Sequence, residues 1–72
     1  MLKMIKLTCC KYYSTTQRIW EPMYINTKSI ATLYWNQDLN YTEISFITNE
    51  RLEHVEETPE QILQLIKEAE NV

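Results

Sequence analysis

Apolar and polar side chains alternate along the beginning of the chain, from Leu2 to Cys10. Ile5, Leu7 and Cys9 fall on one side of this alternation, and the intervening side chains fall on the other. A period of two is typical of a half-buried β-strand, because successive side chains of an extended chain point to opposite faces. The pattern therefore predicts a first strand with Ile5, Leu7 and Cys9 on one face.

The alternation is lost over residues 11–22. Small hydroxylic side chains interrupt it, and Pro22 lacks the N–H that a central strand position needs. We interpret this segment as a long loop or an excursive hairpin. The next signals are a short strand, a turn of small polar residues and another strand, over Met23–Ile25, 26–29 and Ile30–Trp35.

A hairpin is predicted in the middle of the chain. Residues 36–40 contain Asn and Asp side chains, which favour turns and tolerate left-handed backbone positions. The strand that follows, over Tyr41–Thr48, alternates strongly, and we expect Ile44 and Phe46 to face the core. A tight turn and a returning antiparallel strand complete this region, at Asn49–Glu50 and Arg51–Val55.

The most specific local signal is the start of a helix near the end of the chain. Thr58 is suited to the N-cap, Pro59 to the first helical position and Gln61 to the third, which together predict a capping box. We expect the helix over residues 59–70, with one apolar stripe packed on the sheet. The stripe consists of Ile62, Leu63, Leu65, Ile66 and Ala69.

These elements predict one small domain over residues 1–72. Its fold class is α+β, a small curved antiparallel sheet or barrel of four to five strands followed by one C-terminal helix. A domain of this length buries only about 60% of the surface of its unfolded chain, so a further stabilising contact is usually needed. We therefore expect a homo-oligomer.

Composition excludes several classes of function. The chain has no glycine, which excludes the Gly-rich loops that bind phosphates. One histidine and two adjacent cysteines, Cys9 and Cys10, lack the spacing of a zinc site, and we expect no metal and no cofactor. The longest apolar run is too short for a membrane span, and residues 1–8 lack the features of a signal peptide, which predicts a cytoplasmic location.

The net charge of −3 hides an asymmetry between the two halves of the chain. The first 36 residues carry five basic side chains and one acidic one, whereas the last 36 carry two basic and nine acidic ones. In a small folded domain the two halves lie close together. We interpret the asymmetry as a basic sheet edge and an acidic helix face.

His54 is the one candidate for acid–base chemistry. Glu53, Glu56 and Glu57 lie near it in the sequence, and carboxylates beside a histidine occur in acid–base sites. No nucleophile motif or second basic partner accompanies it, so we favour a surface histidine and predict no enzymatic activity.

Basic and aromatic side chains interleave after the first strand. This arrangement occurs on surfaces that stack bases and hold phosphates, and also where aromatic rings fill a subunit contact. Tyr34 and Trp35 are adjacent on a strand, so one ring must point outward and needs a covering partner. The candidate protein contacts are Tyr12, Tyr13, Trp20 and Trp35. The candidate nucleic-acid contacts are Lys11, Arg18 and Lys28.

Several short motifs follow one another along the chain in a characteristic order. They are Met4-Ile5-Lys6-Leu7-Thr8, Ile25-Asn26, Ile44-Ser45-Phe46-Ile47-Thr48-Asn49 and Val55-Glu56-Glu57-Thr58-Pro59-Glu60-Gln61-Ile62. This order resembles the small FlbD-like proteins of flagellar and swarming operons. The resemblance implies an antiparallel sheet with a terminal helix and a supporting role in motility, and it implies no catalytic residues. A weaker likeness is to the carbon-storage-regulator type of RNA-binding dimer.

The sequence therefore predicts a small non-enzymatic adaptor or regulatory protein that binds another protein and acts as a homo-oligomer. One alternative is a nucleic-acid-binding or nucleotide-binding module that uses the basic and aromatic segment. Another alternative, suggested by size and simplicity alone, is a virus-borne antagonist of a host protein.

Overall fold

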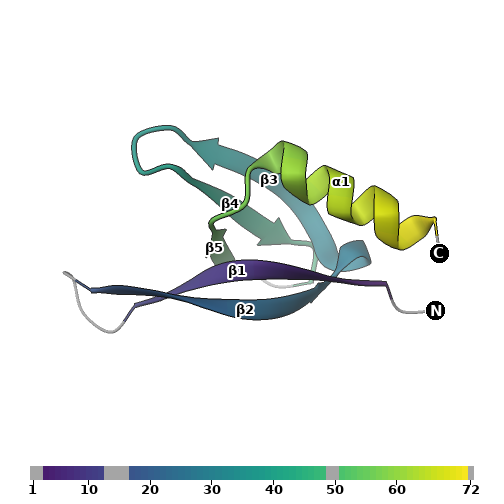
Figure 1. Cartoon of the computed structure of the whole chain (residues 1–72), viewed down its shortest axis with the longest axis horizontal. Helices are drawn as coiled ribbons and strands as arrows, with labels where there is room; N and C mark the ends of the chain where they lie inside the picture. Colours follow the sequence, from purple (N-terminus) through teal and green to yellow (C-terminus); the bar gives the residue numbers. More distant parts are fainter. Residues whose placement is uncertain (1–2, 13–16, 49–50, 72) are drawn as a thin grey trace.

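The computed structural model describes residues 3–12, 17–48 and 51–71, with Tyr12 described by its backbone alone. Within these residues, five strands and two helical segments follow one another along the chain (Figure 1). They are β1 (Met4–Tyr12), β2 (Arg18–Asn26), the 3₁₀ segment η1 (Thr27–Ser29), β3 (Ile30–Asn36), β4 (Tyr41–Phe46), β5 (Leu52–Val55) and the helix α1 (Pro59–Glu70).

All five strands belong to one antiparallel sheet in the order β2-β1-β5-β4-β3. β2 and β3 form its two edges, so the described sheet is open rather than closed into a barrel. β1 and β5 share a single pair, Cys9 and Val55, and this short junction joins the β1–β2 ribbon to the other three strands. The α+β class, with an antiparallel sheet and one C-terminal helix, is confirmed.

β1 and β2 form a long hairpin, which decides between the two interpretations of residues 11–22, a long loop or an excursive hairpin. The two strands pair without interruption from Met4 and Asn26 to Tyr12 and Arg18. Pro22 is accommodated because β2 is an edge strand, where the missing N–H removes no bond of the ladder. The excursive hairpin is therefore correct, and the strand expected over Met23–Ile25 is longer than its pattern indicated.

The β3–β4 hairpin turns through residues 37–40, within the predicted loop. The Asn36 Oδ1 accepts hydrogen bonds of 3.1 Å from the backbone N–H groups of Asp38 and Leu39. Asn40 has a φ of 58°, a left-handed conformation that Asn adopts more readily than most residues. The side-chain chemistry of this turn thus replaces the missing glycine.

β4 and β5 agree with the expected strands apart from their ends. β4 ends at Phe46 rather than Thr48, and β5 begins at Leu52. Ile44 is fully buried and Phe46 packs against the core, as predicted. The turn expected at Asn49–Glu50 lies outside the described residues.

α1 has the predicted bounds and the predicted cap. The Thr58 Oγ1 accepts a hydrogen bond from the Gln61 N–H at 3.2 Å, and the Gln61 Oε1 accepts one from the Thr58 N–H at 2.8 Å. These reciprocal bonds form a capping box, which satisfies N–H groups that have no partner within the helix. Ile62 is completely buried, and the other helix residues that pack on the core are Leu65, Ile66 and Ala69.

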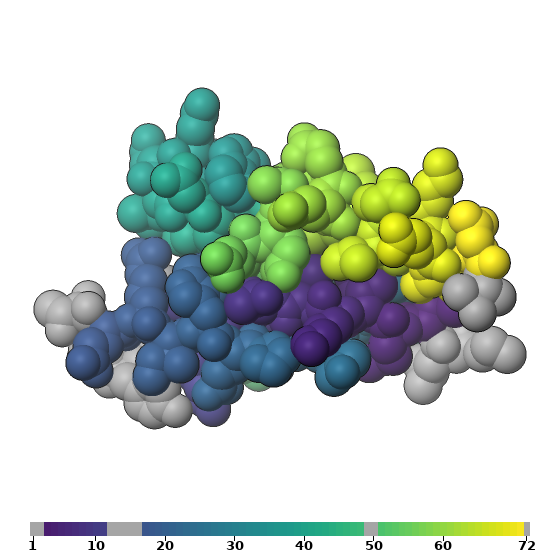
Figure 2. Space-filling model, in the orientation of Figure 1, coloured from purple at the N-terminus to yellow at the C-terminus, as the bar shows by residue number. Residues whose placement is uncertain are grey.

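The core lies on one face of the sheet, here called the inner face. α1 packs on this face and runs along β1 (Figures 1 and 2). The buried core residues are Ile5, Leu7, Cys9, Ile25, Ile44, Val55 and Ile62. Strand alternation places the intervening residues on the opposite, outer face.

Glu57 joins the start of α1 to two strands. Its carboxylate accepts hydrogen bonds of 2.9 Å from the N–H and from the Oγ1 of Thr8 on β1. Its backbone carbonyl accepts a bond of 2.6 Å from the Oγ1 of Thr42, a fully buried residue of β4. The glutamate therefore continues the β1 ladder beyond the last residue of β5.

Candidate binding surface

The outer positions of β2 carry a row of large side chains, here called the β2 stripe: Arg18, Trp20, Pro22 and Tyr24. Their common face follows from the uninterrupted pairing of β2 with β1. Tyr24 is 65% exposed and Trp20 is half-buried. Trp, Tyr and Arg are the residue types that most often dominate the energy of protein interfaces.

One end of the β2 stripe meets a cluster on the outer face of β4 and β5. The Arg18 guanidinium carbon lies 5.8 Å from the ring centroid of Tyr41, within the range of a cation–π attraction. Tyr41 stacks on His54 with centroids 4.4 Å apart and an interplanar angle of 24°. The His54 Nε2 lies 3.7 Å from the Glu43 Oε1. We call Arg18, Tyr41, Glu43 and His54 the outer cluster.

The outer cluster changes the interpretation of His54. The ring is half-buried rather than a surface side chain, and Tyr41 covers one of its faces. Tyr41 itself is only 5% exposed although it lies on the outer face. The stacking of His54 on Tyr41 and the contact of His54 with Glu43 hold the imidazole within the cluster. This arrangement indicates that His54 has a structural role in supporting the adjacent β2 stripe.

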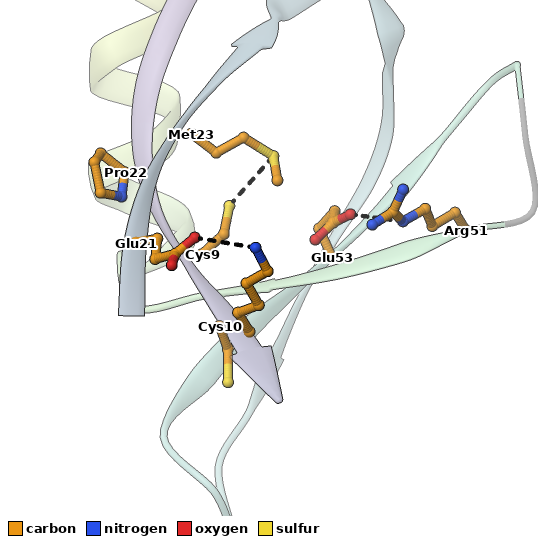
Figure 3. Close-up of a pocket in the computed structure, with 8 residues that line it drawn as sticks. Cys9, Cys10, Glu21, Pro22, Met23, Arg51 and Glu53 are labelled. Carbon is orange, nitrogen blue, oxygen red and sulfur yellow. Dashed lines mark hydrogen bonds and ion pairs between the residues drawn. The ribbon is translucent and has the colours of Figure 1, made fainter. Parts of the chain in front are cut away.

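A cleft of about 230 Å³ opens on the other side of the β1–β2 ribbon (Figure 3). Its charged side chains are paired: Lys11 Nζ lies 3.7 Å from Glu21 Oε2, and Arg51 Nε lies 2.9 Å from Glu53 Oε1. Opposite charges therefore balance within the cleft, and nothing in this lining favours a strongly charged ligand.

Two sulfur atoms meet at the wall of this cleft. The Cys9 thiol donates to the thioether of Met23, with the sulfur atoms 3.6 Å apart, and Cys10 points in the opposite direction (Figure 3). Burial, followed by the negative charges of Glu53 and Glu57 and by Cys10, raises the pKa of Cys9 to about 12. The Cys9 thiol is therefore protonated at neutral pH, which disfavours it as a nucleophile or a metal ligand.

The three basic candidates for nucleic-acid contact do not come together. Lys11 occupies an inner position of β1 opposite Ile19, whereas Arg18 lies on the outer face. Lys28 lies in η1, beyond the far end of β2. That end of the strand, Asn26, is about 27 Å from Arg18 at a rise of about 3.4 Å per residue. These three residues therefore do not form a continuous basic patch of the kind that binds a phosphate backbone.

The aromatic candidates have different positions. Trp20 belongs to the β2 stripe, whereas Trp35 is half-buried opposite the buried Thr42. Tyr34 is the outward ring of the adjacent pair, at 62% exposure. The outward ring of this pair is therefore that of Tyr34, whereas Trp35, a candidate protein contact, lies on the inner side of β3. Tyr13 and the side chain of Tyr12 lie outside the described residues.

Sequence reasoning missed Tyr41 and Glu43 as members of a site. Their alternation with Thr42 and Ile44 placed both on the outer face, but the approach of Arg18 depends on the twist between the β1–β2 ribbon and β4. Strand twist is a property of the whole sheet, so the local pattern carried no signal for this contact.

Within the described residues, no helix is long and apolar enough to cross a membrane. The same residues contain no group of three or more His, Cys, Asp or Glu side chains that could hold a metal ion. Comparison of the chain with family models, with curated proteins and with solved structures finds no match.

Proposed function

We propose that this protein is a non-enzymatic adaptor or regulatory protein that binds another protein through the β2 stripe. The observation that carries the proposal is the row of Trp20, Pro22 and Tyr24 on the open face of an edge strand, ending in Arg18. The resemblance to FlbD-like proteins supports the same non-enzymatic class. A role in motility stays a prediction.

The mode of binding follows from the edge position of β2. A partner strand that paired with this edge would meet Pro22, which has no N–H to donate. The aromatic rings offer a better contact, because they bury much apolar area at a small cost in side-chain entropy. We therefore propose docking on the outer face rather than addition of a strand.

The test compares the parent chain with Trp20→Ala and Tyr24→Ala. Each protein carries a tag, is purified from its own cells without nuclease, and is examined by native mass spectrometry for a partner in fixed stoichiometry. Once the partner is identified, we expect each substitution to weaken its binding by on the order of 2 kcal/mol, about thirtyfold in Kd.

Leu63→Ala is the matched control, because Leu63 is a large apolar side chain exposed on α1, away from the β2 stripe. It should bind the partner as the parent does. If both aromatic variants bind like the parent, the proposed surface is wrong. If the bound material is nucleic acid released by salt, the proposed class of protein is wrong.

A further inference from the structure

Most of the second edge of the sheet, β3, lacks the features that normally block an edge strand. It consists of Ile30–Asn36 and contains no charged residue and no proline. Natural edge strands usually carry a charge, a proline or a bulge, because a bare edge pairs with other strands. A register shift lies at the start of β3, between Ile30 and Thr32, and the rest of the strand pairs regularly with β4. Residues 32–36 thus remain open to pairing.

We infer that β3 pairs antiparallel with β3 of a second copy, about a two-fold axis at Leu33. In this register the exposed Tyr34 of each copy lies opposite the partner's Thr32. Aromatic and β-branched side chains form favourable cross-strand pairs. The two sheets join into one continuous sheet, and both β3 edges are covered.

Charges just beyond the two ends of β3 favour the antiparallel arrangement. Lys28 lies five residues before Leu33, and Asp38 lies five residues after it. Lys28 belongs to η1 and Asp38 to the β3–β4 turn, so an antiparallel pair brings the Lys28 end of one β3 alongside the Asp38 end of the partner's β3, twice in one dimer. Both side chains are exposed, and neither makes an ion pair within the described chain. A parallel pair of β3 strands would instead bring like charges together at each end.

The inference goes beyond the proposed binding of a foreign protein. It uses the opposite edge of the sheet from the β2 stripe, and it supplies a geometry for the homo-oligomer expected from the length of the chain. Its failure would leave the β2 stripe untouched, because the two surfaces lie on different strands.

The first measurement is sedimentation equilibrium of the full chain at increasing concentration. We expect a reversible rise toward twice the mass of one chain, which is 8.7 kDa. A monomer mass at every concentration up to the solubility limit would overturn the inference.

Charge reversal then tests the antiparallel arrangement. Lys28→Asp alone and Asp38→Lys alone each place like charges together twice, and each should raise the dissociation constant by roughly tenfold. An equimolar mixture of the two variants should regain parent-like association as a heterodimer, since every contact then joins opposite charges. Lys67→Asp on the exposed side of α1 is the control and should associate like the parent.

A matched pair of tyrosines tests the edge itself. Tyr34→Lys places a charge on β3 and should abolish the dimer, whereas Tyr24→Lys makes the same change at an equally exposed ring on β2 and should leave the dimer intact. Circular dichroism confirms that both variants remain folded. A dimer that persists in Tyr34→Lys, or one that the mixed charge variants do not restore, would contradict pairing through β3.

Discussion

The thiol of Cys9 differs from that of its neighbour because of its position in the core. Its raised pKa, about 12, arises mainly from burial and then from Glu53 and Glu57. Since the thiolate is the reactive form, Cys9 should be alkylated by iodoacetamide much more slowly than Cys10 at neutral pH. The variants Cys10→Ser and Cys9→Ser, each with one thiol, allow the two rates to be measured separately. Equal rates would contradict the burial of Cys9.

The raised pKa of Cys9 also predicts how the free energy of unfolding depends on pH. The folded chain favours the neutral form of the Cys9 thiol. The contribution of this thiol to the free energy of unfolding is therefore complete below pH 9.0, and it falls as the pH rises from 9.0 toward 12. Urea unfolding of the parent and of Cys9→Ala across this range should show a steeper loss in the parent. Parallel losses in the two proteins would show that the pKa of Cys9 is not raised by folding.

Glu57 should contribute more to stability than its neighbour Glu56. Glu57→Ala leaves the Thr8 N–H and hydroxyl without their acceptor, which we expect to cost about 1–3 kcal/mol in the free energy of unfolding. Glu56→Ala removes an equal charge from an exposed side chain and serves as the control. Urea unfolding should separate the two variants, and equal stabilities would argue against the bond to β1.

At the scale of the element, the cap of α1 is open to a direct test. Thr58→Ala removes the Oγ1 acceptor of the capping box and should cost about 1 kcal/mol, whereas Thr58→Ser retains the acceptor and should cost less. Thermal unfolding followed by circular dichroism measures both. If the alanine and serine variants melt together, the capping bond contributes nothing to stability.

The elements differ in how far they could be predicted from the sequence. The start of α1 follows from local chemistry, because Thr58, Pro59 and Gln61 specify a helix start without help from the rest of the chain. The sequence pattern underestimates the length of β2, because a proline such as Pro22 interrupts only a strand that has neighbours on both sides. Whether a strand lies at an edge depends on the order of the whole sheet, which no local pattern contains.

At the scale of the whole molecule, the register of the sheet decides which candidate residues share a surface. Lys11 and Arg18 are near in sequence, yet their positions on adjacent paired strands place them on opposite faces. Arg18 and Tyr41 are distant in sequence, but the guanidinium carbon of Arg18 lies 5.8 Å from the ring centroid of Tyr41. The aromatic character of the surface was therefore predictable, whereas the dispersal of the basic residues and the outer cluster were not.

The most direct test of the proposed function is the mass and ultraviolet spectrum of the complex that the chain forms in its own cells. The complex is purified without nuclease and examined by size-exclusion chromatography with light scattering at low and high salt. We expect the spectrum of protein alone and a mass that equals whole copies of the chain plus a second protein, lost in the Trp20→Ala and Tyr24→Ala variants. A nucleic-acid spectrum that disappears in high salt would contradict the proposal.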